Sequence, residues 1–166
     1  MKYFFSIFSL LIFFQCSFPN FGFGREKQTI FIDSAPRSPF AKIADTLASD
    51  GKERKLIVLN FLNSEGREHK MGNMFAEKLT TELVKQKNFT VLDRVLFSKK
   101  LKDHSIELNS SPDLNYIRKV GELLSVDSVV AGVVTPAAAS GFDINARLID
   151  AKTGMILSAE EAFFAD

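Results

Sequence analysis

The stretch KLIVLNFLN, residues 55–63, decides the fold because it is short, almost continuously apolar and rich in branched side chains. A strand that is covered on both faces has this composition, whereas a strand with one face in water alternates apolar and polar residues. Residues 55–63 therefore predict an interior strand of a sheet with elements packed on both sides.

The segments that follow this strand predict a β-α-β unit. The turn SEGRE (64–68) leads into a helix over about 69–86, and FTVLDR (89–94) has the pattern of a second strand. The apolar stripe of this helix consists of Met71, Met74, Phe75, Leu79 and Leu83. Two parallel strands joined by a helix form a right-handed unit, so residues 55–94 should place two strands side by side.

Three further helices are predicted. The first begins at Pro39 after a capping Ser38 and stops near Gly51, and a short one covers about 95–103. The last has Ser111 as its cap, Pro112 at its first position and Asp113 in its first turn. Its buried side should consist of Leu114, Ile117, Leu123 and Leu124, with Val120 partly buried.

The C-terminal third predicts three strands. Residues 128–135 are apolar, and residues 142–150 alternate between a buried and a wetter face. The turn DAKTG (150–154) returns the chain antiparallel over 155–164. The predicted order is α-β-α-β-α-α-β-β-β, an α/β (α+β) domain over 38–166 with a mixed sheet and packed helices.

The N-terminal segment has the pattern of an export signal. Lys2 precedes residues 3–14, which are apolar apart from two serines and too short to span a bilayer. We expect a signal over 1–15 and a tether over 16–37, in which Pro19, Gly22 and Gly24 interrupt any helical period. Whether QTIFID (28–33) adds an edge strand is left open.

Cys16 is the only cysteine of the chain, and Gln15 alone separates it from the apolar run. The sequence IFFQC resembles the lipobox of bacterial lipoproteins, in its relaxed spirochaete form, because Phe13 and Gln15 replace the usual Leu and small residue. That resemblance implies acylation of the Cys16 thiol and cleavage before it. The alternative is a cysteine that follows an ordinary signal by chance.

Composition and motifs argue against several classes of function. The chain has 21 Lys+Arg and 20 Asp+Glu, and removing Lys2 with the signal leaves 20 of each. Such a balance of charges does not indicate a protein that binds nucleic acid, which usually has an excess of basic residues. His69 and His104 lie on different predicted elements without metal-ligand spacing, and no nucleophile turn or phosphate loop occurs. We expect no enzyme activity, no metal and no cofactor.

A few polar residues are candidates for an interaction site or for structural roles in turns. Asp93 and Arg94 end a predicted strand, where they could pair with each other or bind a partner. The C-terminal hairpin carries Asn145, Arg147, Asp150 and Gly154, for which a solvated face and turn stabilisation are the favoured interpretation. Lys99, Lys100 and Lys102 should form a solvated helix face.

Residues 38–164 resemble the FlgO-type domain and its CsgG-like relatives among bacterial envelope lipoproteins. The likeness rests on LIVLNFLNSEGREHKMGNMFAEKLTTELVKQKNFTVLDR, IRKVGELLSVDSVVAGVVT and INARLIDAKTGMILSAE, in that order, and on the leading helix FAKIADTLASD. It implies an envelope role: FlgO-type proteins are associated with the outer membrane and the flagellar apparatus, LpoB-like relatives activate penicillin-binding proteins, and CsgG forms a secretion pore. The long amphipathic hairpins of such a pore are not evident here.

The resulting hypothesis is a non-catalytic lipoprotein anchored by Cys16 in the outer membrane, with its domain facing the periplasm and binding proteins of an envelope assembly, for which the flagellar apparatus is a candidate. An LpoB-like regulator of a peptidoglycan synthase and a CsgG-like secretion component are the alternatives. Self-association through an exposed sheet edge is left open.

Overall fold

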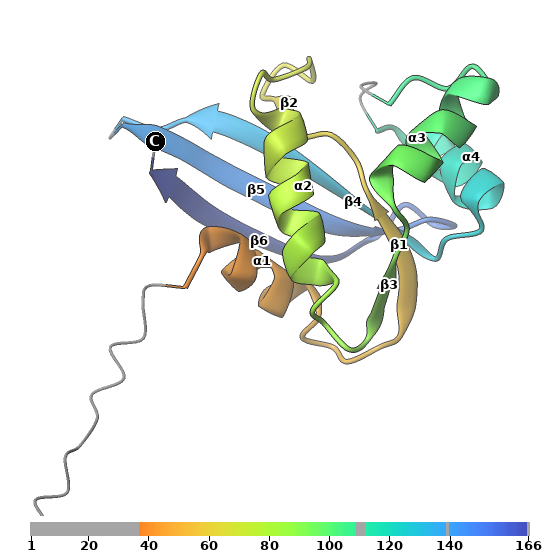
Figure 1. Ribbon diagram of the computed structural model, residues 1–166, viewed down its shortest axis with the longest axis horizontal. Coiled ribbons are helices and arrows are strands. Elements are labelled where there is room, and N and C mark those ends of the chain that lie inside the picture. The colour runs from red at the N-terminus through yellow and green to blue at the C-terminus, as the bar shows by residue number, and fades with distance from the viewer. Residues whose placement is uncertain (1–36, 109–111, 139, 166) are drawn as a thin grey trace, which may run out of the picture. The chain divides into compact units, whose positions relative to one another are not determined.

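The computed structural model describes residues 37–108, 112–138 and 140–165. Within these ranges the predicted order of elements is confirmed, with one additional two-residue strand, β2 (Figure 1). The elements are α1 (Pro39–Leu47), β1 (Arg54–Val58), β2 (Leu62–Asn63), α2 (Gly72–Leu83), β3 (Phe89–Val91), α3 (Arg94–Asp103), α4 (Leu114–Leu124), β4 (Ser128–Pro136), β5 (Gly141–Asp150) and β6 (Ile156–Ala165).

The strands form one mixed sheet in the order β3-β1-β4-β5-β6, and β2 also pairs with β4. Strand β1 lies between β3 and β4 and runs parallel to both. Strands β4, β5 and β6 are antiparallel neighbours. The interior position of β1 and its parallel pairing with β3 confirm the two predictions made from residues 55–94.

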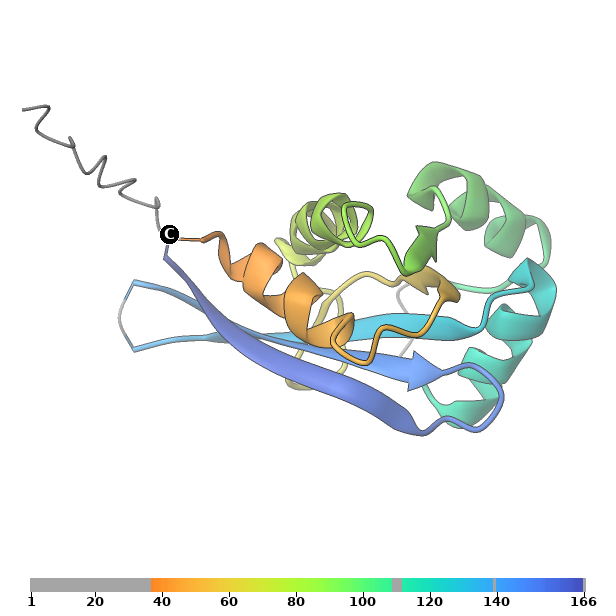
Figure 2. The same cartoon turned by 90° about the horizontal axis from the view of Figure 1, so that it is seen from below.

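Two apolar cores lie on opposite faces of this sheet. One packs α1 and α2 against residues such as Val58, Val130 and Leu148, and the other packs α3 and α4 against Ile57, Val129 and Ile149. Adjacent residues of a strand point to opposite faces, which explains why Ile57 and Val58 belong to different cores. Figures 1 and 2 show α3 and α4 gathered at the end of the sheet near β1, while α1 lies along β6.

The predicted single strand over 55–63 is wrong in one respect, because it is interrupted at residues 59–61. In β1, Val58 pairs with Val130, and in β2, Leu62 pairs with Val133, so four steps on one strand match three on the other. The extra residue is a local bulge, which reverses the direction of the side chains that follow it. Phe61 consequently joins the same core as Val58, with no exposed surface.

Several element boundaries differ from the predicted ones. Helix α1 ends at Leu47 rather than near Gly51, and the strand predicted over 89–94 ends at Val91, so Asp93 and Arg94 begin α3 instead of ending a strand. Helix α2 covers Gly72–Leu83 rather than 69–86. Helix α4 begins at Leu114, and its cap is the Asp113 side chain, which accepts a hydrogen bond from the backbone N–H of Tyr116 at 2.7 Å. The predicted cap at Ser111 is therefore wrong, and Leu114, expected to be buried, is 41% exposed because it sits at the first helical position.

Cys16 and the segment 28–33 lie outside the described residues. In the described ranges, no helix has the length and apolar character needed to cross a membrane.

Candidate functional site

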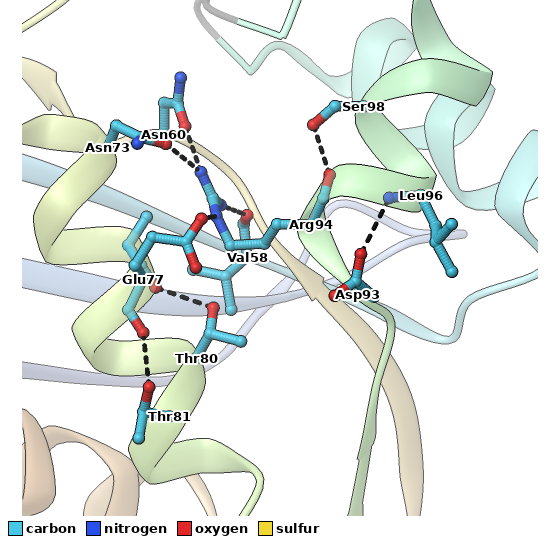
Figure 3. Close-up of polar contacts among 11 residues, drawn as sticks. Val58, Asn60, Asn73, Glu77, Thr80, Thr81, Asp93, Arg94, Leu96 and Ser98 are labelled. Carbon is cyan, nitrogen blue, oxygen red and sulfur yellow. Dashed lines mark hydrogen bonds and ion pairs between the residues drawn. The ribbon is translucent and has the colours of Figure 1, made fainter.

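Arg94 is the most highly connected polar side chain at the carboxyl end of β1. It is the first residue of α3, and its side chain is buried, with 5% of the residue exposed. Three segments surround it: the end of β1 with its bulge, the first turns of α2, and α3 itself (Figure 3). The guanidinium therefore lies where two helices meet the sheet.

Each guanidinium nitrogen of Arg94 donates to a neighbouring acceptor. Nε donates to Oε1 of Glu77 at 2.7 Å. One Nη donates to the carbonyl oxygen of Val58, and the other donates to Oδ1 of Asn60 and to Oδ1 of Asn73, the latter at 2.9 Å. The Arg94 guanidinium carbon also lies 5.9 Å from the ring centroid of Phe97.

This arrangement gives Arg94 a structural role. A buried guanidinium is tolerated when its donors are satisfied, and each of the three guanidinium nitrogens of Arg94 has at least one acceptor within the fold. The carboxylate partner of Arg94 is Glu77, whereas the predicted neighbour Asp93 accepts from the backbone N–H of Leu96 at 3.0 Å and caps α3. Arg94 thus ties α2 and α3 to the end of β1.

The four candidate residues of the C-terminal hairpin lie in two different places. Asp150 and Gly154 belong to the β5–β6 turn. Oδ1 of Asp150 accepts from the backbone N–H groups of Lys152 and Thr153, at 3.0 and 2.7 Å, and from the Thr153 hydroxyl at 2.8 Å. These hydrogen bonds lower the pKa of the Asp150 carboxyl. Gly154 has a φ of +75°, which few other residues adopt. Both residues stabilise the turn, as the sequence suggested.

Asn145 and Arg147 instead line a groove on the face of the sheet that α3 and α4 cover only near β1. The groove has a volume of about 440 Å³. Its walls are the 62–66 segment, Pro112, residues 131–133 of β4, and Asn145, Arg147 and Ile149 of β5. This groove is the candidate functional site, because it combines an open cavity with polar and apolar side chains.

The 62–66 wall of the groove is held by its own turn. Oδ1 of Asn63 accepts from the backbone N–H groups of Glu65 and Arg67, at 3.0 and 2.9 Å. The backbone N–H of Asn63 donates to the Arg67 carbonyl at 2.8 Å, and Gly66 supplies a φ of +74°. This Asx turn stabilises the loop locally, and the pairing of Leu62 and Asn63 with β4 attaches it to the sheet.

The histidines and the lysine run lie apart from this groove. Burial, and secondarily the charge of Lys70, lowers the pKa of His69, whose ring packs edge-on against Phe142 at 5.5 Å. The His104 ring nitrogen bonds to the Lys100 carbonyl at 2.9 Å. Across the described ranges, no cluster of three His, Cys, Asp or Glu side chains could hold a metal ion.

Sequence reasoning did not identify Asn63 as part of a site, nor Asn60, Asn73 and Glu77 as partners of Arg94. The turn signal in SEGRE was visible, but its position across the sheet from Arg147 depends on the bulge at residues 59–61. The partners of Arg94 come from separate segments, and no local pattern connects them.

Comparison with known proteins identifies one family. The sequence profile described as FlgO protein matches residues 41–166. No curated protein matches the chain in a sequence search.

Solved structures share the fold at low sequence identity. The LpoB C-terminal domain from Salmonella enterica aligns with a TM-score of 0.59 and 14% identity, covering 76% of this chain and 98% of that one. The LpoB C-terminal domain from Escherichia coli gives 0.58 and 13%, with the same coverage. Lipoprotein GNA1162 from Neisseria meningitidis gives 0.51 and 18%, covering 68% of this chain and 80% of that one.

Proposed function

We propose, because this chain belongs to the FlgO protein family, that it is an envelope lipoprotein whose α/β domain binds a protein partner and catalyses no reaction. The observation that carries the proposal is the family match, which extends over residues 41–166 and so includes nearly the whole described domain. The family resemblance inferred from the sequence is confirmed by this match.

The proposed organisation has three parts. Residues 1–15 are an export signal, Cys16 carries the lipid, and residues 16–37 connect the anchor to the domain at 38–166. The position of a lone cysteine shortly after an apolar run supports this division. A single acyl chain binds membranes only marginally, so stable anchoring requires more than one chain at Cys16.

Protein binding is favoured over catalysis by the roles of the conspicuous polar residues. Arg94 is engaged by Glu77 and three further acceptors, and Asp93 and Asp150 are engaged by backbone N–H groups. The groove at Arg147 remains as a surface with an open cavity and mixed chemistry, as is usual for a recognition site.

The specific role that we propose is service to an outer-membrane or periplasmic assembly of the flagellar apparatus. A strain lacking the protein should lose motility or the normal composition of its flagellar envelope complex, and the wild-type chain should restore both. The Cys16→Ala variant should restore neither, if the anchor holds the domain at its site of action. Unchanged motility and unchanged complex composition in the deletion strain would contradict the flagellar role.

A regulator of a peptidoglycan synthase is the second candidate, favoured by the fold shared with LpoB C-terminal domains. The test is a reconstituted synthase assay with the full chain in detergent. Stimulation of the synthase would support this candidate, whereas an unchanged rate would remove it. A CsgG-like secretion component is a third alternative, and no feature of the described residues supports it specifically.

A further inference from the structure

The groove contains a cation without an acidic partner. Arg147 lies between Ala146 and Leu148, which are both buried against α1 and α2, so its side chain is on the opposite, open face. Directly across from Arg147 are Ala131 on β4 and Ala159 on β6. Neither cross-strand neighbour therefore supplies a carboxylate to the guanidinium.

The contacts of Arg147 confirm this isolation. Its Nε donates to Oδ1 of Asn145 at 3.1 Å, and in the described part of the chain no carboxylate forms an ion pair with it. On the same face, Asp143 stands opposite Phe163, and Glu161 stands opposite Asn145, diagonal to Arg147. Because none of the ion pairs in the described ranges includes Arg147, its guanidinium is available for an external anion.

The carboxylate that lines the groove is already engaged. Glu65 forms an ion pair with Arg67 on the same turn, and Arg67 is not a lining residue. Among the described lining residues, Arg147 thus supplies a positive charge that Glu65 does not neutralise. The groove also offers amide groups from Asn63 and Asn145.

Apolar surface lies next to this charge. Leu62, Val133 and Ile149 line the groove together with Ala131. A cavity of about 440 Å³ can hold a few side chains of an extended peptide. Side chains of an extended peptide point alternately to opposite faces, so one cation beside an apolar floor matches a segment with an acidic residue and an apolar residue two positions apart.

We propose that this groove binds an acidic, partly apolar segment of a partner protein. A carboxylate of that segment accepts hydrogen bonds from the Arg147 guanidinium, and the apolar side chain two positions along the segment packs on Val133 and Ile149. An arginine fork bonds a carboxylate with two parallel N–H donors, which gives direction as well as attraction. This inference rests on the proposed function, because it names the chemistry of the partner that the domain binds.

The test uses the full chain in detergent and two labelled six-residue peptides with blocked ends, an Asp peptide with Val, Asp and Val at its odd positions and Ser at the others, and an Asn peptide with Asn in place of the Asp. Fluorescence anisotropy should show at least tenfold tighter binding of the Asp peptide, as expected for loss of a charge-assisted contact. Added salt should weaken the binding of the Asp peptide more than that of the Asn peptide.

Arg147→Gln should abolish the preference for the Asp peptide while leaving the thermal unfolding of this exposed position unchanged. The matched control is Arg118→Gln, which removes an exposed arginine from α4, outside the groove, and should preserve the preference. Equal binding of both peptides, no saturable binding of the Asp peptide, or a preference that survives in Arg147→Gln would each overturn the inference.

Vesicles with anionic phospholipid provide a further arm of the same experiment. Binding to these vesicles that depends on Arg147, without binding of the Asp peptide, would identify a lipid surface and overturn the inference. The Arg147→Gln variant should still be acylated and should still fractionate with membranes. A failure of peptide binding in a correctly anchored protein therefore contradicts this inference alone, whereas a missing anchor contradicts the proposed function.

Discussion

At the scale of single residues, Arg94 shows how a buried charge can organise a fold. Its donors reach Glu77, Val58, Asn60 and Asn73, and these acceptors belong to segments that are separate in sequence. Removing the guanidinium would remove one hydrogen bond from each of them. A planar fork also cannot be replaced by a single ammonium group, because the lysine head presents its donors from one point.

We therefore predict that Arg94→Lys lowers the free energy of unfolding by about 3 kcal/mol, the cost of disrupting a buried, hydrogen-bonded charge. Urea denaturation of both proteins measures this change. Arg147→Lys, at an exposed position, is the control and should change stability by less than about 0.5 kcal/mol. Equal stability of Arg94→Lys and wild type would show that the cluster contributes little to the fold.

Tyr116 provides a second test at this scale. Its hydroxyl is buried without a hydrogen-bond partner in the described part of the chain, and burial raises the pKa of Tyr116 from 10.0 to about 12. Because the folded protein holds this proton more tightly than the unfolded chain, the associated stability is complete below pH 10 and is lost as the pH rises toward 12.

Tyr116→Phe should thus be neutral or stabilising by about 1 kcal/mol at pH 7, since it removes an unsatisfied buried hydroxyl. It should also make the decline in stability between pH 10 and 12 shallower than in wild type. Denaturation curves of both proteins across this range provide the measurement. A marked loss of stability at pH 7 would mean that the hydroxyl has a partner.

At the scale of elements, the bulge at residues 59–61 determines how α2 meets the sheet. Both Gly132 and Gly72 lie too close to Phe61 to carry a side chain. A Cβ added to Gly132 would lie 2.5 Å from the Phe61 ring, and a Cβ added to Gly72 would lie 1.9 Å from the Phe61 carbonyl oxygen. The backbone N–H of Phe61 donates to the Gly72 carbonyl at 3.3 Å. The first turn of α2 therefore rests directly on the backbone of the bulge.

Gly72→Ala should destabilise the domain by about 3 kcal/mol, because the clash involves backbone rather than a movable side chain. Thermal or urea unfolding measures the effect. Asn115→Ala, at an exposed position near the start of α4, introduces alanine without a clash and should be nearly neutral. Wild-type stability of Gly72→Ala would show that α2 can shift freely over the bulge.

An ion pair between Asp50 and Arg54 stabilises the loop that connects α1 to β1. Two guanidinium nitrogens of Arg54 donate to the two Asp50 carboxylate oxygens, at 2.9 and 2.6 Å. The hydrogen bonds from Arg54 lower the pKa of Asp50 to about 2. A lowered carboxyl pKa means that the stabilisation is present above pH 3.8 and disappears as the pH falls toward 2.

Asp50→Asn should cost about 1 kcal/mol at pH 7, a value kept small because the Asp50 side chain is 41% exposed and solvent screens the pair. Near pH 2 the difference in stability between the variant and wild type should have fallen to a small part of its value at pH 7. Urea denaturation at both pH values tests this expectation, with the exposed Glu107→Gln as control. A difference that persists unchanged at pH 2 would rule out the ion pair as its cause.

Sequence patterns predicted the elements well because each element repeats a local rule. The apolar run of β1, the alternation along β5 and the Asp150–Gly154 turn are all defined by neighbouring residues. The break in the 55–63 strand could not be predicted, since Phe61 is placed by Gly72 and Gly132, which lie elsewhere in the chain. The partners of Arg94 and the groove at Arg147 could not be predicted either, because they are also formed by residues that are distant from one another in the sequence.

The whole molecule, in the function proposed above, consists of a lipid anchor at Cys16 and a domain that binds a protein partner. In the described domain, Arg147 lines a groove without forming an ion pair, and the Arg94 cluster joins α2 and α3 to the end of β1. An anchor at Cys16 would confine this groove to the neighbourhood of a membrane, where a weak contact with a partner gains effective concentration. The anchor is thus the claim on which the envelope role depends.

Intact mass spectrometry of the protein extracted from its native membrane, beside a Cys16→Ala variant, tests this claim most directly. The mass of the wild-type protein should correspond to a chain that begins at Cys16 and carries added acyl chains. The mass of the variant should show neither the cleavage nor the acyl chains. An unmodified wild-type chain, or one cleaved at another position, would contradict the anchored envelope protein described here.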